Sequence, residues 1–289
     1  MYGNFFDNNL LPPLREVIRL NSLYARHAYG QHFLLDINLI RRIVKNAGNL
    51  AGETVIEIGP GPGGLTRGLL EVAGRVIVIE RDQRFSHSLE QLSVKSNGRL
   101  KVIIGDATQV CLKELINSEK TATIVSNLPY NAGTKMLIHW LRDLSRIKSM
   151  TLMFQKEVAD RITAHIGNKS YGRLSVISQW LCQTRRLFNV PASAFVPVPK
   201  VISSVVMLQP RLTSVFPANF SALEAVTRAA FGQRRKMLKS SLKTLIEYPE
   251  IILQNTDIDA TMRAEQISVE NYCRIARNYT RILSGNINQ

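Results

Sequence analysis

The chain of 289 residues carries 37 Lys and Arg against 22 Asp and Glu, a formal net charge of +15 at pH 7. Its hydrophobic residues amount to 45%, the share of an ordinary globular protein, which excludes a disordered chain; the length suits one large domain or two unequal ones. No apolar run approaches the roughly 18 residues that a membrane span needs. We therefore expect a cytoplasmic globular protein, and the excess positive charge suggests a polyanionic partner.

Residues 54–127 alternate between short apolar runs and helical patterns. Four strands are predicted here. The first three cover residues 54–58, 75–80 and 100–107, and the fourth ends at Asn127. Strands that alternate with helices in this way form a parallel sheet with crossover helices. The fold class predicted for this part is α/β, a doubly wound Rossmann-like domain.

Downstream, the sequence predicts a helix over residues 134–144, a strand over 149–155 and two closing strands around a proline-rich loop. A break in composition follows near residues 210–220, and beyond it only helical periodicity is left. The chain is thus expected to have an N-terminal extension, a ligand-binding α/β domain and a small all-helical C-terminal domain. These parts cover residues 1–25, 26–210 and 211–289.

Glycines and acidic residues gather where the predicted strands end. Gly59, Gly61 and Gly63 form the turn after the first strand, where the missing side chains let backbone amides approach a ligand. Glu80 ends the second strand, and Asp106 lies at the end of the third. Because the carboxyl ends of parallel strands face one crevice, we predict one shared ligand, with Glu80 accepting hydrogen bonds from both hydroxyls of a ribose.

The spacing of the glycines narrows the choice of ligand. Glycine at every second position differs from the G-x-G-x-x-G pattern, and the intervening prolines stiffen the turn, which argues against a dinucleotide pyrophosphate. An adenosine that bears an amino acid fits better. We therefore expect S-adenosylmethionine as the cofactor.

The fourth strand leads into the candidate catalytic residues Asn127, Leu128, Pro129 and Tyr130. The N6 amino group of adenine is a poor nucleophile, because its lone pair is delocalised into the ring. A site that accepts both N6 protons, on the side-chain oxygen of Asn127 and the carbonyl of Leu128, would free this lone pair to attack a methyl sulfonium without a general base. Pro129 fixes the direction of that carbonyl, and Tyr130 offers a face for stacking.

Several segments together resemble the ribosomal RNA adenine dimethyltransferase family, from about Arg26 almost to the C-terminus. They are the Asn-Leu-Pro-Tyr motif, the E-x-G-x-G-x-G turn, and the stretches 29–34, 194–201, 231–236 and 263–268. The resemblance is greatest to the bacterial branch that dimethylates two adjacent adenosines near the 3′ end of 16S rRNA in the small (30S) ribosomal subunit. It implies a monomeric S-adenosylmethionine-dependent RNA methyltransferase, without a metal or a membrane partner, that has a role in subunit maturation.

The resemblance also implies roles for single residues. The cofactor-binding residues that it implies are His32, Leu34, Gly59, Gly61, Glu80, Asp106 and Asn127. Phe195 would pack against the flipped target base opposite Tyr130. Position 32 is His where the family leads us to expect Asn, so the hydrogen bond from this side chain to the cofactor carboxylate would depend on pH.

Positive charge lies outside the predicted ligand-binding stretch. Residues 51–134 have 9 basic and 9 acidic side chains, whereas residues 135–210 have 11 and 3. A further basic cluster, Arg234, Arg235 and Lys236, is either a solvated helix face or a surface for RNA phosphates, and we predict the second.

Three alternative functions stay open. A 23S rRNA adenine methyltransferase of the antibiotic-resistance type would share the fold and the Asn-Leu-Pro-Tyr motif but would differ in its target. A mainly noncatalytic RNA-binding or ribosome-assembly factor could retain the fold, although the intact site argues against it. A DNA adenine methyltransferase is disfavoured, because the sequence offers no separate domain for reading bases. The scattered histidines and the three distant cysteines lack metal-ligand spacing, so we predict no metal site.

Overall fold

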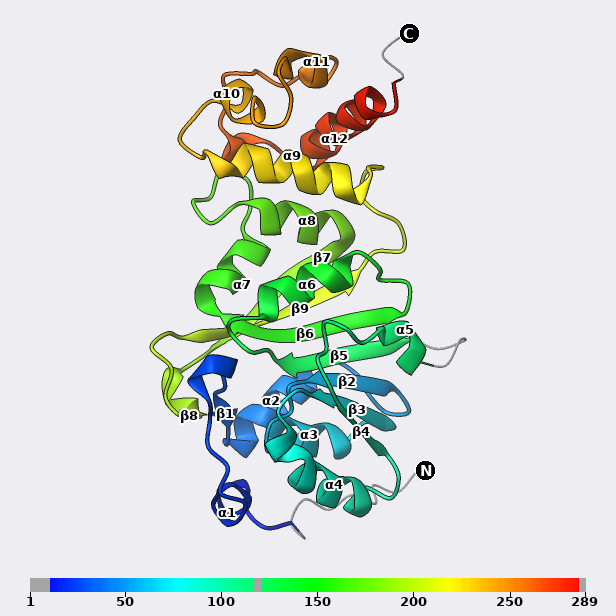
Figure 1. Ribbon diagram of the computed structural model, residues 1–289, viewed down its shortest axis with the longest axis vertical. Helices are drawn as coiled ribbons and strands as arrows, with labels where there is room; N and C mark the ends of the chain where they lie inside the picture. The colour runs from blue at the N-terminus through cyan, green and yellow to red at the C-terminus, as the bar shows by residue number, and fades with distance from the viewer. Residues whose placement is uncertain (1–10, 117–120, 286–289) are drawn as a thin grey trace. The chain divides into compact units, whose positions relative to one another are not determined.

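The computed structural model describes residues 11–116 and 121–285 (Figure 1). The first ten residues of the expected N-terminal extension lie outside the described residues, and the rest of it contains the helix α1 (Leu14–Leu20). The chain divides into two compact units. The first consists of Met1–Ala159 with Arg185–Gln209, and the second of Asp160–Thr184 with Pro210–Gln289.

The first unit is organised around a seven-stranded sheet with the strand order β4-β3-β2-β5-β6-β9-β7. In chain order these strands are β2 (Thr54–Ile58), β3 (Arg75–Glu80), β4 (Leu100–Ile104), β5 (Ala122–Asn127), β6 (Ile147–Gln155), β7 (Cys182–Val190) and β9 (Ser203–Pro210). The predicted strands at 54–58 and 75–80 are confirmed with these bounds, and the doubly wound α/β fold class is confirmed as well.

Strand pairing places a topological switch point in this sheet. The pairs β2–β3, β3–β4, β2–β5 and β5–β6 are parallel, and β9 runs antiparallel to β6. The chain moves outward from β2 to β4 and then returns to the opposite side of β2 as β5. Open α/β sheets bind ligands outside the carboxyl ends of the strands at such a point.

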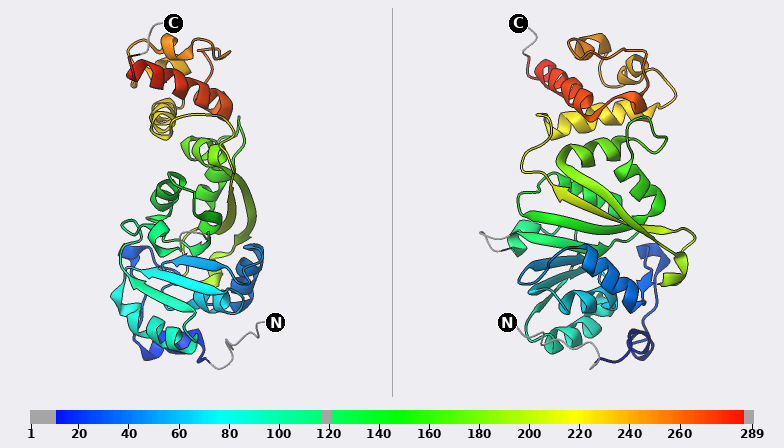
Figure 2. Two further views of the ribbon diagram at one scale, coloured as in Figure 1. Left: turned by 90° about the vertical axis from the view of Figure 1, so that its right-hand side faces the viewer. Right: turned by 180° about the vertical axis from the view of Figure 1, so that it is seen from behind.

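Apolar side chains cover both faces of the sheet. Val76 and Val78 of β3 belong to a core with the helices α2 (Ile37–Asn46), α3 (Gly64–Leu70) and α4 (Ser86–Lys95), whereas Ile77 and Ile79 point to the other face and are buried too. Figure 2 shows helices on both faces. The unit also contains α5 (Leu112–Leu115) and α6 (Gly133–Leu141), and α7 (Lys156–Thr163) runs from this unit into the second.

A second, two-stranded sheet lies in the same unit and was not predicted. It pairs β1 (Phe33–Leu34) antiparallel with β8 (Phe195–Val196), with Leu34 opposite Phe195. Strands of two residues are too short to produce a recognisable alternation in sequence. This pairing fixes the segment before α2 to the proline-rich loop that precedes β9.

The second unit is helical. Its helices are α8 (Arg173–Leu181), α9 (Phe220–Gly232), α10 (Leu238–Leu242), α11 (Pro249–Leu253) and α12 (Val269–Leu283). They bury a common apolar cluster, in which the hydroxyl of Tyr272 donates to the carbonyl of Ala264 at 2.8 Å. Asn219 caps α9 and Ser268 caps α12, each by accepting the backbone N–H of the residue three positions further on.

The division of the chain differs from the expected boundary in one stretch. Residues 160–184 precede residue 210 but belong to the helical unit. Trp180 on α8 donates to the carbonyl of Phe216 at 2.7 Å, and Tyr171 donates to that of Ile267 at 3.1 Å. The amphipathic pattern of α8 predicts a helix with a buried face, but it does not say which apolar cluster that face joins.

Candidate active site

A cavity of about 410 Å³ opens beside the carboxyl ends of β2, β3 and β5, at the switch point of the sheet. This volume is within the range of small-molecule sites. Ten of the sequence-predicted site residues line it. They are His32, Leu34, Gly59, Gly61, Glu80, Asp106, Asn127, Leu128, Pro129 and Tyr130. The structure thus brings together residues that are up to 98 positions apart in the chain, between His32 and Tyr130.

The glycine turn after β2 adopts a conformation that favours glycine. Gly59, Gly61 and Gly63 have φ angles of +67°, +54° and +89°. The N–H of Gly61 donates to Oε2 of Glu80 at 2.9 Å, so the turn closes around the end of β3. A side chain at Gly61 would require a strained backbone and would face Phe33 at 3.6 Å.

Two buried carboxyl groups lie in this cavity. Glu80 is 5% exposed and also accepts the N–H of Asp82 at 2.8 Å; burial raises its pKa although its backbone hydrogen bonds oppose the rise. Glu57 is 2% exposed and accepts the hydroxyl of Thr66 at 2.7 Å. Burial raises the pKa of Glu57 to about 8, with a smaller contribution from the charge of Glu80. Such a site favours a ligand that brings positive charge.

Asp106 both lines the cavity and caps the turn that follows β4. Its Oδ1 accepts the hydroxyl and the N–H of Thr108 at 2.7 and 2.9 Å, and its Oδ2 lies 3.6 Å from Nη1 of Arg81. The hydrogen bonds from Thr108 lower the pKa of Asp106. The capping interaction and a place at the ligand cavity are therefore compatible.

Asn127 is oriented by the backbone of the segment across the cavity. Its Nδ2 donates to the carbonyl of His32 at 3.1 Å. Because the amide nitrogen is used in this bond, the amide oxygen is turned away from that carbonyl and is the atom that can accept a hydrogen bond from a ligand.

Tyr130 lines the cavity, and its hydroxyl is hydrogen-bonded to a residue of strand β9. The hydroxyl is hydrogen-bonded to Oγ of the fully buried Ser203 on β9 at 2.5 Å, and burial raises the pKa of Tyr130. The ring of His32 lies 5.0 Å away, centroid to centroid, at an interplanar angle of 31°. Nδ1 of His32 lies 2.8 Å from the carbonyl oxygen of Pro197. Since a carbonyl oxygen only accepts hydrogen bonds, Nδ1 carries the proton, and Nε2 is the ring nitrogen that this bond does not use.

Phe195 does not reach the cavity. Its side chain is fully buried in the apolar cluster that also contains Val190 and Val205, and it does not line the cavity. The expectation that this ring stacks on a base opposite Tyr130 does not match this position. The sequence motif around Phe195 does not indicate whether its side chain is exposed or buried. Its place in the core goes with the pairing of β1 with β8, which was not predicted.

Arg234, Arg235 and Lys236 lie in the second unit and are exposed. They follow the end of α9 at Gly232 and form a turn before α10, so they do not form a helix face. Nη2 of Arg234 donates to the carbonyl of Lys169 at 2.9 Å. The side chains of Arg235 and Lys236 extend from the turn that this hydrogen bond stabilises.

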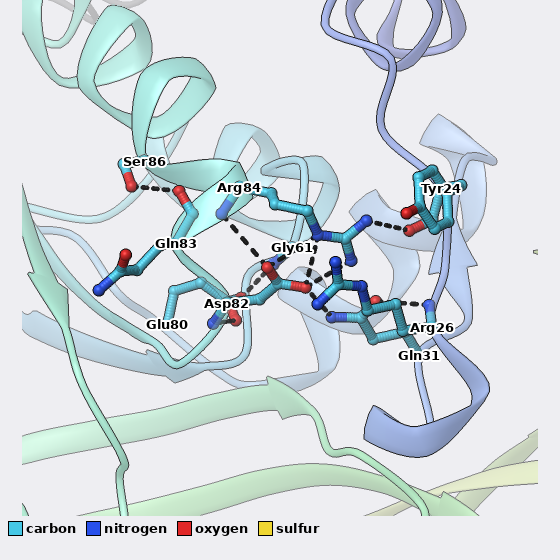
Figure 3. A network of polar contacts seen from close by, with 9 residues as sticks. All are labelled: Tyr24, Arg26, Gln31, Gly61, Glu80, Asp82, Gln83, Arg84 and Ser86. Carbon is cyan, nitrogen blue, oxygen red and sulfur yellow. Dashed lines mark hydrogen bonds and ion pairs between the residues drawn. The ribbon is translucent and has the colours of Figure 1, made fainter.

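A polar network next to Glu80 was not predicted from the sequence. Gln31, Asp82 and Arg84 form its centre (Figure 3). The signal was present, because Asp82 lies only two positions after Glu80 and Gln31 belongs to the segment that resembles the family. Ser203 was also missed, since nothing in its local sequence indicates a partner 73 residues away.

Within residues 11–116 and 121–285, no helix combines the length and the apolar character that crossing a bilayer requires.

Comparisons with known proteins show the family of this chain. Residues 23–281 match the family described as ribosomal RNA adenine dimethylase. The chain is 51% identical over 279 residues to ribosomal RNA small subunit methyltransferase A of Xanthobacter autotrophicus, covering 95% of this chain and 96% of the relative. It is 52% identical to the protein of the same name from Paramagnetospirillum magneticum, covering 92% of this chain and 94% of that one.

Solved structures give the same picture of the fold. A dimethyladenosine transferase from Plasmodium falciparum has a TM-score of 0.72 at 24% identity, covering 86% of this chain and 98% of that one. The 23S rRNA methyltransferase ErmE has a TM-score of 0.65 at 25% identity, covering 86% and 99%. The chain belongs to the ribosomal RNA adenine dimethylase family.

Proposed function

We propose that this protein transfers methyl groups from S-adenosylmethionine to N6 of two adjacent adenosines near the 3′ end of 16S rRNA, giving N6,N6-dimethyladenosine, and so contributes to maturation of the small ribosomal subunit. The observation that carries the proposal is the convergence of Glu80 and the Asn127 amide in one cavity at the switch point of the sheet. The choice of substrate is supported by relatives of about 50% sequence identity, which are named for the small ribosomal subunit.

The cavity fits the cofactor in shape and in charge. Gly59 and Gly61 leave room for a close approach to the backbone, and Leu34 supplies apolar surface. Each oxygen of Glu80 accepts one backbone N–H and keeps lone pairs for the hydroxyls of a ribose. A positive sulfur would favour ionisation of the buried carboxyl groups of Glu57 and Glu80, whose pKa values burial raises in the cofactor-free protein. When bound, S-adenosylmethionine supplies an electrophilic methyl group on a sulfonium.

Asn127 and its neighbours would hold the adenine. The side-chain oxygen of Asn127 and the backbone carbonyl of Leu128 accept hydrogen bonds from the two N–H groups of N6, which draws this nitrogen toward tetrahedral geometry and makes its lone pair available. After the transfer, the positively charged amine loses a proton. Pro129 restricts Leu128 to an extended conformation. The ring of Tyr130 stacks on the base and offsets part of the cost of taking it out of the RNA, about 1 to 3 kcal/mol.

The remaining parts of the proposal concern partners. Arg235 and Lys236, on the turn after α9, contact phosphates of the rRNA, and Arg234 supports them. The protein acts as a monomer on RNA within the 30S subunit, which places it in the cytoplasm. The reaction as proposed needs no metal ion, and among the described residues no three His, Cys, Asp or Glu side chains form a group that could hold one.

Methylation of 23S rRNA is the alternative function that a separate observation supports. The likeness to ErmE, at 25% identity, makes 23S rRNA the second candidate target. Identities near 50% to proteins named for the small subunit favour 16S rRNA instead. A mainly noncatalytic assembly factor would have no use for the polar residues that converge on this cavity.

The substrate is tested by methyl transfer from labelled cofactor to unmethylated small subunits, large subunits and duplex DNA in parallel, with identification of the modified nucleoside. We expect label only in small subunits, as N6,N6-dimethyladenosine. Label only in large subunits would favour the alternative, and no label in any of the three would contradict an enzymatic role.

A further inference from the structure

A polar cluster joins two segments at the edge of the cavity. One is the segment 24–32, named here the rim segment, and the other is the loop after β3 (Figure 3). Gln31, Asp82 and Arg84 form the cluster, and in Figure 3 their side chains meet between the two segments. The rim segment contains only a three-residue 3₁₀ helix, His27–Tyr29, so its position depends largely on such side-chain contacts.

Arg84 uses all three of its guanidinium nitrogens in this cluster. Nε and Nη2 donate to the carboxylate of Asp82 at 3.0 and 2.6 Å, and Nη1 donates to the carbonyl of Tyr24 at 3.1 Å. The guanidinium also lies 4.6 Å from the centre of the Tyr24 ring. Two parallel bonds to one carboxylate give both strength and a fixed orientation.

Asp82 connects the rim segment to Glu80. Its Oδ2 accepts Nε2 of Gln31 at 3.1 Å, while Oε1 of Gln31 accepts the N–H of Arg26 at 2.8 Å. The N–H of Asp82 donates to Glu80 at 2.8 Å. Asp82 is 4% exposed; burial opposes its ionisation, but the hydrogen bonds from Arg84 and Gln31 outweigh this and lower its pKa.

The rim segment is also held on the other side of the cavity. Nδ2 of Asn131 donates to the carbonyl of Ala28 at 3.1 Å, and Asn127 donates to that of His32. Residues Ala28 to His32 line the cavity itself. The segment therefore extends across the cavity from the loop after β3 to the loop after β5.

We propose that Asp82 and Arg84 are positioning residues that hold the rim segment over the cofactor and so determine how long the cofactor remains bound. The inference rests on the proposed function, because it takes an adenosine cofactor as the ligand. Dissociation of the cofactor requires the rim segment to move, and the Asp82–Arg84 pair opposes that movement. Neither side chain takes part in the transfer of the methyl group.

Arg84→Ala tests this directly, with binding of S-adenosylmethionine and of its demethylated product measured without RNA. We expect the dissociation rate and Kd to rise about tenfold, while kcat at saturating cofactor stays within about twofold of the wild type. Arg84→Lys keeps the charge but loses the paired geometry, so an intermediate rise is expected. Arg41→Ala is the matched control, since Arg41 makes a similar two-bond pair with Glu71 in the same unit and does not line the cavity.

Trypsin gives a second readout. The Arg26–His27 peptide bond lies in the rim segment, so Arg84→Ala should be cleaved there faster than the wild type, and the demethylated cofactor should slow the cleavage. An Arg84→Ala protein, or Arg84→Lys if the first does not fold, with the wild-type dissociation rate would overturn the proposal. So would an equal change in Arg41→Ala. A wild-type protein that binds no cofactor would instead contradict the proposed function. Failure of the positioning role and failure of the proposed function therefore give different results.

Discussion

Glu57 lines the cavity and is 2% exposed, and burial raises the pKa of its carboxyl group from the ordinary 4.5 to about 8. The folded protein thus binds this proton more tightly than the unfolded chain. In the cofactor-free protein, stability should therefore fall as the pH rises from about 4.5 to about 8, because in that range only the unfolded chain has released the proton.

Glu57→Gln should remove this dependence, because an amide does not titrate and its oxygen can still accept the hydroxyl of Thr66. Relative to the wild type, the variant should gain stability with rising pH, by at most about 1.4 kcal/mol per pH unit. Urea unfolding between pH 5 and 8.5 measures the difference. Parallel stability curves for the two proteins would show that Glu57 titrates normally.

The hydrogen bond between Ser203 on β9 and Tyr130 after β5 links the ends of two strands and fixes the ring that is proposed to stack on the adenine. Ser203→Ala and Tyr130→Phe each remove this one bond and keep the ring. Each should raise KM for the RNA by about fivefold, and the double variant should be no worse than either single one. Ser204→Ala is the control, because the Ser204 hydroxyl donates to Asn189 instead. Additive losses would mean that the bond does not act on Tyr130.

The sequence predicts the central elements well, for a physical reason. The strand β3 is a continuous apolar run bounded by charge, and β2 is a mainly apolar run that only Glu57 interrupts before the glycine turn, a pattern typical of a parallel strand covered on both faces. The cavity residues at the strand ends follow from the same logic. The β1–β8 pair, the buried place of Phe195 and the bond to Ser203 depend on contacts between segments far apart in the chain, about which local periodicity says nothing.

Charge is unevenly distributed among the segments of the chain. The stretch 51–134 supplies most of the cavity and is neutral in sum, whereas the other segments hold the excess of +15. A cofactor with its own positive charge suits the neutral part, and the basic remainder is left for RNA.

Arg235→Ala/Lys236→Ala should weaken binding to small subunits and reduce the salt dependence of log K by up to about one unit for each lost phosphate contact. Arg234 is kept in this variant because its bond to Lys169 holds the turn. Binding is measured over a series of salt concentrations. Lys95→Ala, an exposed change on α4, should leave the slope as in the wild type. An unchanged slope in the double variant would identify these side chains as solvated charges only.

In the proposed reaction the Asn127 amide activates the adenine amino group. The most direct test of this role is the amount of N6,N6-dimethyladenosine formed on unmethylated small subunits by Asn127→Ala, together with the Kd for S-adenosylmethionine by calorimetry. We expect loss of the modified nucleoside with a Kd within about threefold of the wild type, because in the proposed mechanism the amide binds the reacting nitrogen and contributes little to holding the cofactor. Formation of N6,N6-dimethyladenosine at the wild-type rate by Asn127→Ala would contradict this mechanism.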